Sequence, residues 1–307
     1  MTGAEQHEIP EELAGERADV GVSRLTGMSR SKAANLISDG AVTINSKSIG
    51  RSDRLVVGAR LDIAEAPPDV AAQQSQQPVA GLEVMYLDDD IVVVTKPVGV
   101  AAHASPGWTG PTVTAGLPAI GISLADAGPE ERKGIVHRLD VGTSGLMVLA
   151  RTPLAYTSLK DQFKQREVAK TYHALVQGHP DPSTGTINAP TGRHPAHDYR
   201  FAVVADGKPS VTHYRTLEAF SYASLLEIGL ETGRTHQIRV HMSALRHPCC
   251  GDMTYGADPV LATRLGLSRQ WLHAVKLTIT HPRTGERVTF ESPYPADLEG
   301  ALEILAD

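Results

Sequence analysis

The stretch GIVHRLDVGTSGLMVLART (residues 134–152) places a single carboxylate, Asp140, between two apolar runs. Ile135 and Val136 precede it, and the strand-like residues 146–149 follow a turn rich in Gly, Thr and Ser. Burying a carboxylate without a partner costs free energy. We therefore expect Asp140 either to pair with a base for structural reasons, Arg138 or a distant one, or to serve a site that needs a poorly solvated carboxylate.

The segments that flank this stretch predict alternating helices and strands. Thr152 and Pro153 are typical of an N-cap and a first helical position, so a helix is expected from there to about residue 168. The segment AKTYHALVQG and several later segments alternate like strands, and further helices are expected near Thr235 and from Asp297. Successive strands joined by short turns predict an α+β fold with a mixed, mainly antiparallel sheet.

The front of the chain differs from the rest in charge. The whole chain carries a formal net charge of −6, yet residues 17–63 hold eight Lys or Arg against four Asp. We divide the chain into a flexible tail (1–16), a small α/β domain (17–63), a Pro/Gln-rich linker (64–81) and a large domain (82–307). A local basic patch governs phosphate binding better than the total charge does.

The composition favours a soluble protein of the reducing cytoplasm. The apolar runs are too short to span a bilayer, and the N-terminus has no signal-like region. The only cysteines, Cys249 and Cys250, are adjacent and have too few companions for a zinc site. We expect small buried thiols and no metal.

Three segments of the large domain are dense in polar side chains: HRLDVGTSG (137–145), AKTYHALV (169–176) and TGRTHQIRVHMSALRHPCCGD (232–252). In the third segment Thr235 and Arg239 lie four residues apart. If a helix opens at Thr235, a guanidinium there can bond a buried carboxylate in a bidentate manner. This gives Asp140 a possible distant partner.

These three segments, in this order and together with KPVGVAAH (96–103), resemble the RluA/RluD-type pseudouridine synthases. Residues 17–63 are similar to the small α-L RNA-binding domain that is often fused to the front of that family. The resemblance implies conversion of uridine to pseudouridine in structured RNA, without cofactor or metal. One departure is Val141-Gly142, where many members carry charged residues directly after the aspartate.

The resemblance also implies roles for individual residues. Asp140 would be the single catalytic aspartate, Tyr172 would lie against the target ring, and Arg138 would fill the gap left by the extruded base. Arg239 would pair with the aspartate, with Arg234 as the alternative. The RNA-binding candidates are Arg138, Arg234, His137, Arg30, Lys32, Lys47 and Arg51.

Structural interpretations stand beside these roles. His137 and His236 are more typical of hydrogen-bonded structural histidines, and the bases of residues 17–63 can be a solvated face. A carboxylate nucleophile must be ionised, which a paired arginine favours. Tyr172 is a poor base unless its pKa is shifted. Its firmer role is contact with the ring.

The leading functional hypothesis is an RNA pseudouridine synthase, an isomerase acting on large-subunit (23S) ribosomal RNA through base flipping. Transfer RNA is the alternative substrate. A second hypothesis is a non-catalytic RNA-binding or ribosome-assembly factor. A third is a glycosidase, which usually needs two carboxylates where these motifs supply one. We expect RNA as the partner, no membrane association, and a monomer.

Overall fold

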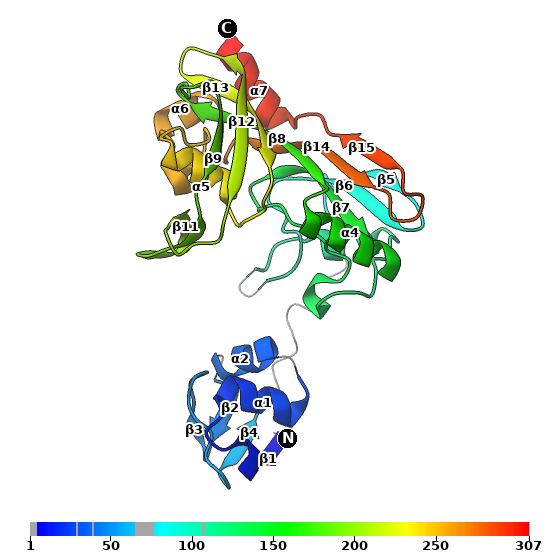
Figure 1. The fold of residues 1–307 in the computed structure, drawn as a ribbon, viewed down its shortest axis with the longest axis vertical. Coiled ribbons are helices and arrows are strands. Elements are labelled where there is room, and N and C mark those ends of the chain that lie inside the picture. The colour runs from blue at the N-terminus through cyan, green and yellow to red at the C-terminus, as the bar shows by residue number, and fades with distance from the viewer. Residues whose placement is uncertain (1–4, 29, 39, 65–76, 106–107, 307) are drawn as a thin grey trace. The chain divides into compact units, whose positions relative to one another are not determined.

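The computed structural model describes residues 5–28, 30–38, 40–64, 77–105 and 108–306 (Figure 1). The side chains of residues 31, 32, 35, 130, 198 and 199 lie outside this description. The chain divides into two compact units, Met1–Gln73 and Gln74–Asp307. Within the described ranges, no helix has the length and apolarity that crossing a membrane requires.

The first unit packs two helices, α1 (Ala18–Thr26) and α2 (Arg30–Ser38), on a small antiparallel sheet. The sheet has the strand order β1-β4-β2-β3. Its strands are β1 (Glu5–Glu8), β2 (Val42–Ile44), β3 (Lys47–Ser48) and β4 (Arg60–Ile63). Val22 from α1, Leu36 from α2 and Leu61 from β4 are buried in one cluster.

The prediction of a flexible tail over residues 1–16 is wrong for residues 5–16, because these residues belong to the first unit. Strand β1 pairs with β4, and Ile9 N donates to Ala59 O over 3.0 Å. Ile9 and Leu13, four residues apart around the short helix η1 (Glu11–Leu13), are buried in the same core. The polar composition of the N-terminal segment gave no indication that Ile9 and Leu13 are buried. Of the predicted linker 64–81, residues 65–76 lie outside the described residues.

The second unit is built on a nine-stranded sheet in the order β5-β6-β7-β14-β8-β13-β12-β9, with β15 paired to β14. Every pairing is antiparallel except that of β7 with β14. The expected α+β fold with a mixed, mainly antiparallel sheet is therefore confirmed. The strands are β5 (Glu83–Leu87), β6 (Ile91–Lys96), β7 (Ser144–Ala150), β8 (Ala169–Gln177), β9 (Thr184–Asn188), β12 (Val211–Ala219), β13 (Ala223–Leu230), β14 (Leu272–Thr280) and β15 (Arg287–Glu291).

Helices and one hairpin flank this sheet (Figure 1). Helix α4 (Pro153–Gln165) packs on β7 and β14, and the Thr152 hydroxyl caps it by accepting from Ala155 N, as the sequence predicts. Helix α5 (Gln237–Ala244) contacts β12 and the separate hairpin of β10 and β11. The remaining elements are α3 (Val113–Ala119), η2 (Glu130–Arg132), β10 (Thr191–His194), β11 (His197–Val203), η3 (Met253–Tyr255), α6 (Pro259–Arg264) and α7 (Ala296–Ala306).

The turn Asp88–Asp90 carries three carboxylates, and those of Asp88 and Asp90 form contacts with distant side chains. The side chain of Asp90 is 2% exposed and accepts from Arg283 and from the Thr152 hydroxyl. Asp88 accepts from His281 over 2.8 Å. These contacts tie the β5–β6 turn to the β14–β15 turn.

The parallel contact between β7 and β14 fixes the start of β7, and it depends on a glycine. Gly145 has φ +116°, and it stands opposite Ala274. An added Cβ would lie 2.4 Å from Ala274 O, closer than atoms approach without displacement. Glycine alone permits this approach. The loop that carries Asp140 enters β7 at this point.

Candidate active site

Asp140 stands in a tight turn directly before β7, and backbone bonds hold that turn from several sides. Asp140 O accepts from Thr143 N over 3.0 Å, and Val141 O accepts from Gly99 N over 2.9 Å. Gly142 O accepts from Arg269 Nη1 over 3.3 Å. The carboxylate therefore projects from a fixed support into the pocket.

Lys96, from the KPVGVAAH motif, lies beneath this turn. Its Nζ donates to Val100 O over 2.8 Å and to Pro97 O over 2.9 Å, with a longer contact to Val141 O at 3.5 Å. Burial lowers the pKa of Lys96 to about 7, although the charge of Asp140 opposes that shift. The buried amine of Lys96 therefore connects residues 96–103 with the turn that carries Asp140.

Gly142 explains part of the departure at Val141-Gly142. An added Cβ at this position would lie 2.6 Å from Oε1 of Gln270, whose Nε2 donates to the Thr143 hydroxyl over 3.2 Å. A larger residue in this backbone conformation would displace Gln270. In this chain Gln270 therefore occupies the space that a side chain at position 142 would need.

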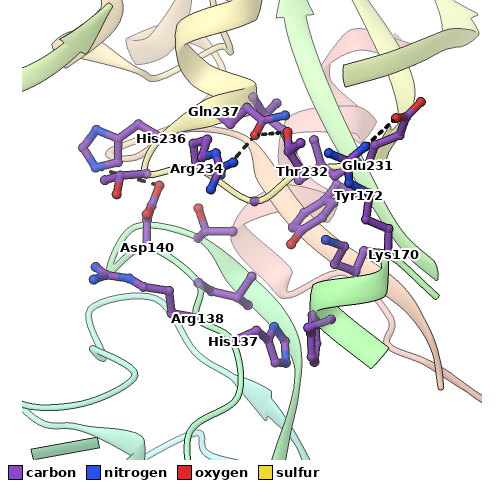
Figure 2. A pocket seen from close by; sticks show the side chains of 18 of the residues that line it. His137, Arg138, Asp140, Lys170, Tyr172, Glu231, Thr232, Arg234, His236 and Gln237 are labelled. Carbon is purple, nitrogen blue, oxygen red and sulfur yellow. Dashed lines mark hydrogen bonds and ion pairs between the residues drawn. The ribbon is translucent and has the colours of Figure 1, made fainter. Parts of the chain in front are cut away.

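Asp140 opens onto a pocket of about 690 Å³ (Figure 2). Figure 2 shows Asp140 pointing from one wall toward the segment with Arg234 and His236, while Tyr172 and Lys170 lie side by side on a third wall. The pocket unites all three polar motifs. Its polar lining consists of His137, Arg138, Asp140, Thr143, Lys160, Asp161, Lys164, Arg166, Lys170, Tyr172, Glu231, Thr232, Arg234, Thr235, His236, Gln237 and Arg239.

Of the two candidate arginines, Arg239 is the one that lies beside Asp140. Its Nη1 lies 3.6 Å from Asp140 Oδ2, and its side chain is 8% exposed. Arg234 is exposed, and its Nε donates to Pro209 O over 3.3 Å. The helix begins at Gln237 instead of Thr235, and His236 before it has φ +57°. The first helical turn then directs Arg239 inward.

The expectation of a bidentate pair between Arg239 and Asp140 is wrong, because Asp252 takes that place. Arg239 Nε and Nη2 donate to the two oxygens of Asp252 over 2.6 and 2.9 Å, and the Asp252 side chain is 1% exposed. Asp252 raises the pKa of Arg239 against the opposing effect of burial. Asp140 thereby keeps one long contact to a guanidinium that another carboxylate already fixes.

Sequence reasoning missed Asp252, although it closes the third motif. The signal was the Gly-Asp pair that follows Cys249 and Cys250, both of which are buried free thiols, as expected. Asp252 N donates to Cys249 O over 3.0 Å, which fixes the loop that presents its carboxylate. Tyr255, three residues on, lies with its ring 4.9 Å from the Arg239 guanidinium.

Tyr172 is buried on β8 and lines the pocket. Burial raises its pKa well above the ordinary value for a phenol, and the charge of Asp140 raises it further. A phenol with a raised pKa holds its proton at neutral pH, which makes it a poor general base. Its apolar ring remains available for contact with a substrate.

The two histidines of the pocket are hydrogen-bonded, as the structural interpretation predicts. His137 Nε2 accepts from Val148 N over 3.0 Å, and burial lowers its pKa to about 3. His236 Nδ1 lies 2.8 Å from the Tyr255 hydroxyl, and burial also lowers its pKa. Both side chains are therefore neutral near pH 7.

The predicted RNA-contacting bases are distributed between the two units. Arg138 is exposed and lines the pocket. In the first unit, Arg30 donates to Asp19 over 2.9 Å, Arg51 donates to the Ser38 hydroxyl, and Lys47 is exposed on β3. The side chain of Lys32 lies outside the described residues. Arg30 is thus partly engaged within its own domain.

Comparison with known proteins decides the family. The family model described as RNA pseudouridylate synthase matches residues 90–244, which include Asp140, Tyr172 and Arg239. The chain belongs to the RluA/RluD-type pseudouridine synthase family. It is therefore an isomerase that makes pseudouridine in RNA.

Several members of the family are similar over nearly the whole chain. An uncharacterized RNA pseudouridine synthase of Mycobacterium bovis is 59% identical, with 97% of this chain and 96% of the relative covered. The ribosomal large subunit pseudouridine synthase D of Pseudomonas aeruginosa is 39% identical, with 97% and 94% covered. The corresponding protein of Neisseria meningitidis is 41% identical, with 97% and 80% covered.

A solved structure supports the same fold for the second unit. Human RNA pseudouridylate synthase domain containing 1 aligns with a TM-score of 0.59 and 30% identity. The alignment covers 72% of this chain and 87% of the human chain. The shared architecture is that of pseudouridine synthase domains.

Proposed function

We propose that this pseudouridine synthase modifies specific uridines of large-subunit ribosomal RNA, with Asp140 as its one catalytic carboxylate. The position of Asp140 carries the proposal. The carboxylate projects from an anchored turn into the pocket, 3.6 Å from a guanidinium that Asp252 holds in place. The ribosomal target is supported by the similarity to relatives named ribosomal large subunit pseudouridine synthase D.

The isomerisation can be described with the carboxylate of Asp140 and the residues around it. The C–N glycosidic bond breaks, the uracil turns, carbon 5 bonds to carbon 1′, and the proton on carbon 5 leaves while N1 gains one. An ionised carboxylate can serve as the nucleophile, toward either the sugar or the pyrimidine ring. Tyr172 supplies an apolar wall for the ring.

A uridine in structured RNA must leave its stack to reach Asp140. Extruding a base costs about a few kcal/mol, least for a base that is already unpaired. Arg138 is exposed at the pocket, two residues before Asp140. We propose that its guanidinium occupies the vacancy in the RNA stack and offsets part of this cost.

Pseudouridine mapping in cells that lack the protein tests this function. We expect a small set of uridines in large-subunit ribosomal RNA to lose the modification, and only the wild-type protein to restore it. The Asp140→Asn variant, expressed at the same level, is the matched control.

Loss of modification in transfer RNA alone would overturn the ribosomal assignment. Restoration of the modification by Asp140→Asn would overturn the catalytic assignment. Rescue of a growth defect by Asp140→Asn, without the modification, would reveal an additional binding role of the protein.

A further inference from the structure

Lys170 is a lysine of the pocket to which the isomerisation assigns no task. It stands two residues before Tyr172 on β8, and residues two apart on a strand share a face of the sheet. Both side chains accordingly line the pocket that contains Asp140 (Figure 2). Lys170 is half-buried, so its ammonium is partly removed from water.

The ammonium group of Lys170 lies beside an aromatic ring. Its Nζ lies 5.8 Å from the centre of the Phe163 ring, and that ring stacks on His137 at 4.6 Å. Among the residues that the structure describes, no carboxylate forms an ion pair with Lys170. Burial alone lowers its pKa, as expected for an ammonium without a nearby carboxylate.

Glu231, a carboxylate that lines the same pocket, already serves two other bases. It lies 3.4 Å from Arg166 Nη1 and 2.7 Å from His213 Nε2. A half-buried cation held by an aromatic stack, but left without a counter-charge, is costly unless a ligand supplies that charge. The feature therefore points to an anionic ligand.

Positive charge continues from Lys170 along the pocket wall. Lys160 and Lys164 of α4 line the same pocket together with one acid, Asp161, and all three side chains are exposed. Arg166, just after α4, lines it as well. A row of bases that leads into a pocket suits a chain of phosphates better than the neutral carbonyl oxygens of a single base.

We propose that Lys170 binds a backbone phosphate of the RNA next to the target uridine, and that Lys160 and Lys164 extend this phosphate track along α4. The inference rests on the RNA substrate of the proposed function. Lys170 then fixes the nucleotide from its backbone side while Tyr172 contacts its ring. The aromatic stack of Phe163 and His137 sets the position of the ammonium.

Binding of a fluorescent short oligouridylate at several salt concentrations tests this proposal. The probe offers a uridine at every position, so its binding does not depend on which cellular RNA is the target. Lys170→Met should weaken binding about tenfold at low salt. It should also reduce the slope of log K against log salt by about 0.7, the contribution of one phosphate contact.

Two further variants separate charge from folding. Lys170→Arg keeps the charge and should keep the slope. Lys276→Met removes a lysine of the neighbouring strand β14 that pairs with Glu291 over 2.6 Å outside the pocket, and it should leave binding unchanged. Melting curves of all the variants show whether any of them fails to fold.

A methylphosphonate oligouridylate, which has no backbone charge, identifies the atom that is bound. Wild type and Lys170→Met should bind this probe equally. The proposal is overturned if Lys170→Met keeps the wild-type salt slope. It is equally overturned if the variant stays weaker on the uncharged probe, because Lys170 would then contact the base. Neither result bears on the ribosomal target, which the mapping experiment tests separately.

Discussion

Asp252→Asn tests how the guanidinium beside Asp140 is held. The substitution keeps the shape of the side chain and one acceptor oxygen, but it removes the charge that Arg239 contacts over 2.6 and 2.9 Å. Removing one partner of a buried ion pair costs about 3–5 kcal/mol. Because one acceptor oxygen is retained, we expect the free energy of unfolding to fall by about 3 kcal/mol. For a domain of this size that corresponds to a Tm lower by about 6–12 °C.

The same substitution should also slow catalysis. With Asp252 neutral, Asp140 becomes the one carboxylate left beside Arg239, since Nη1 already lies 3.6 Å from Asp140 Oδ2. We expect the guanidinium to move toward Asp140 and to engage the oxygens that the reaction needs. A displacement of about 1 Å at a catalytic group can cost 100-fold in rate, so we expect kcat to fall by about 10- to 100-fold.

Asp90→Asn is the matched control. The Asp90 side chain is 2% exposed and accepts two bonds from Arg283, as Asp252 does from Arg239, but it lies outside the pocket. Both variants should lower the Tm, and only Asp252→Asn should lower kcat per folded molecule, measured as pseudouridine formed well below either Tm. The reasoning is refuted if Asp252→Asn keeps wild-type kcat, or if Asp90→Asn reduces kcat equally.

Three other predictions concern stability and the first unit. His273 is buried with its pKa lowered to about 4, so stability should be lost as pH falls from about 6.5, where the unfolded chain gains its proton, toward 4. His273→Gln should reduce this slope by up to about 1.4 kcal/mol per pH unit in urea titrations; an unchanged slope would contradict the assignment. Gly145→Ala should lower the free energy of unfolding by more than about 2 kcal/mol because its Cβ would meet Ala274, whereas Gly300→Ala in α7 meets nothing and should not destabilise. Equal effects of the two would argue against the close approach. Replacing Lys47 and Arg51 together by Ala should flatten the salt dependence of RNA binding by about 1.4, and a wild-type slope would remove both from the RNA interface.

Helices and strands that depend on residues close together in the sequence could be predicted. Helix α4 is an example, because Thr152 caps it and Pro153 occupies its first position. The mainly antiparallel sheet followed from alternating segments joined by short turns. The pocket was predictable in outline because its three motifs are dense in polar residues, and the structure brings all three together.

Features that depend on contacts across the chain could not be predicted in this way. Whether Arg239 pairs with Asp140 or with Asp252 depends on where the Gly-Asp loop folds back, and spacing along the helix carries no information on that. The N-terminal residues Ile9 and Leu13 looked like part of a polar tail because their burial requires the β1–β4 pairing. The ion pair between Asp90 and Arg283 could not be predicted either, because Arg283 lies far along the chain.

The most direct test of the central claim is pseudouridine formation by purified Asp140→Asn on large-subunit ribosomal RNA that lacks the modification. Binding of the same RNA is measured in parallel. In this variant an amide of nearly the same shape replaces the carboxylate that would act as the nucleophile. We predict wild-type affinity and no pseudouridine above background. Pseudouridine formation by Asp140→Asn at a rate near that of the wild type would contradict the assignment of Asp140 as the catalytic carboxylate.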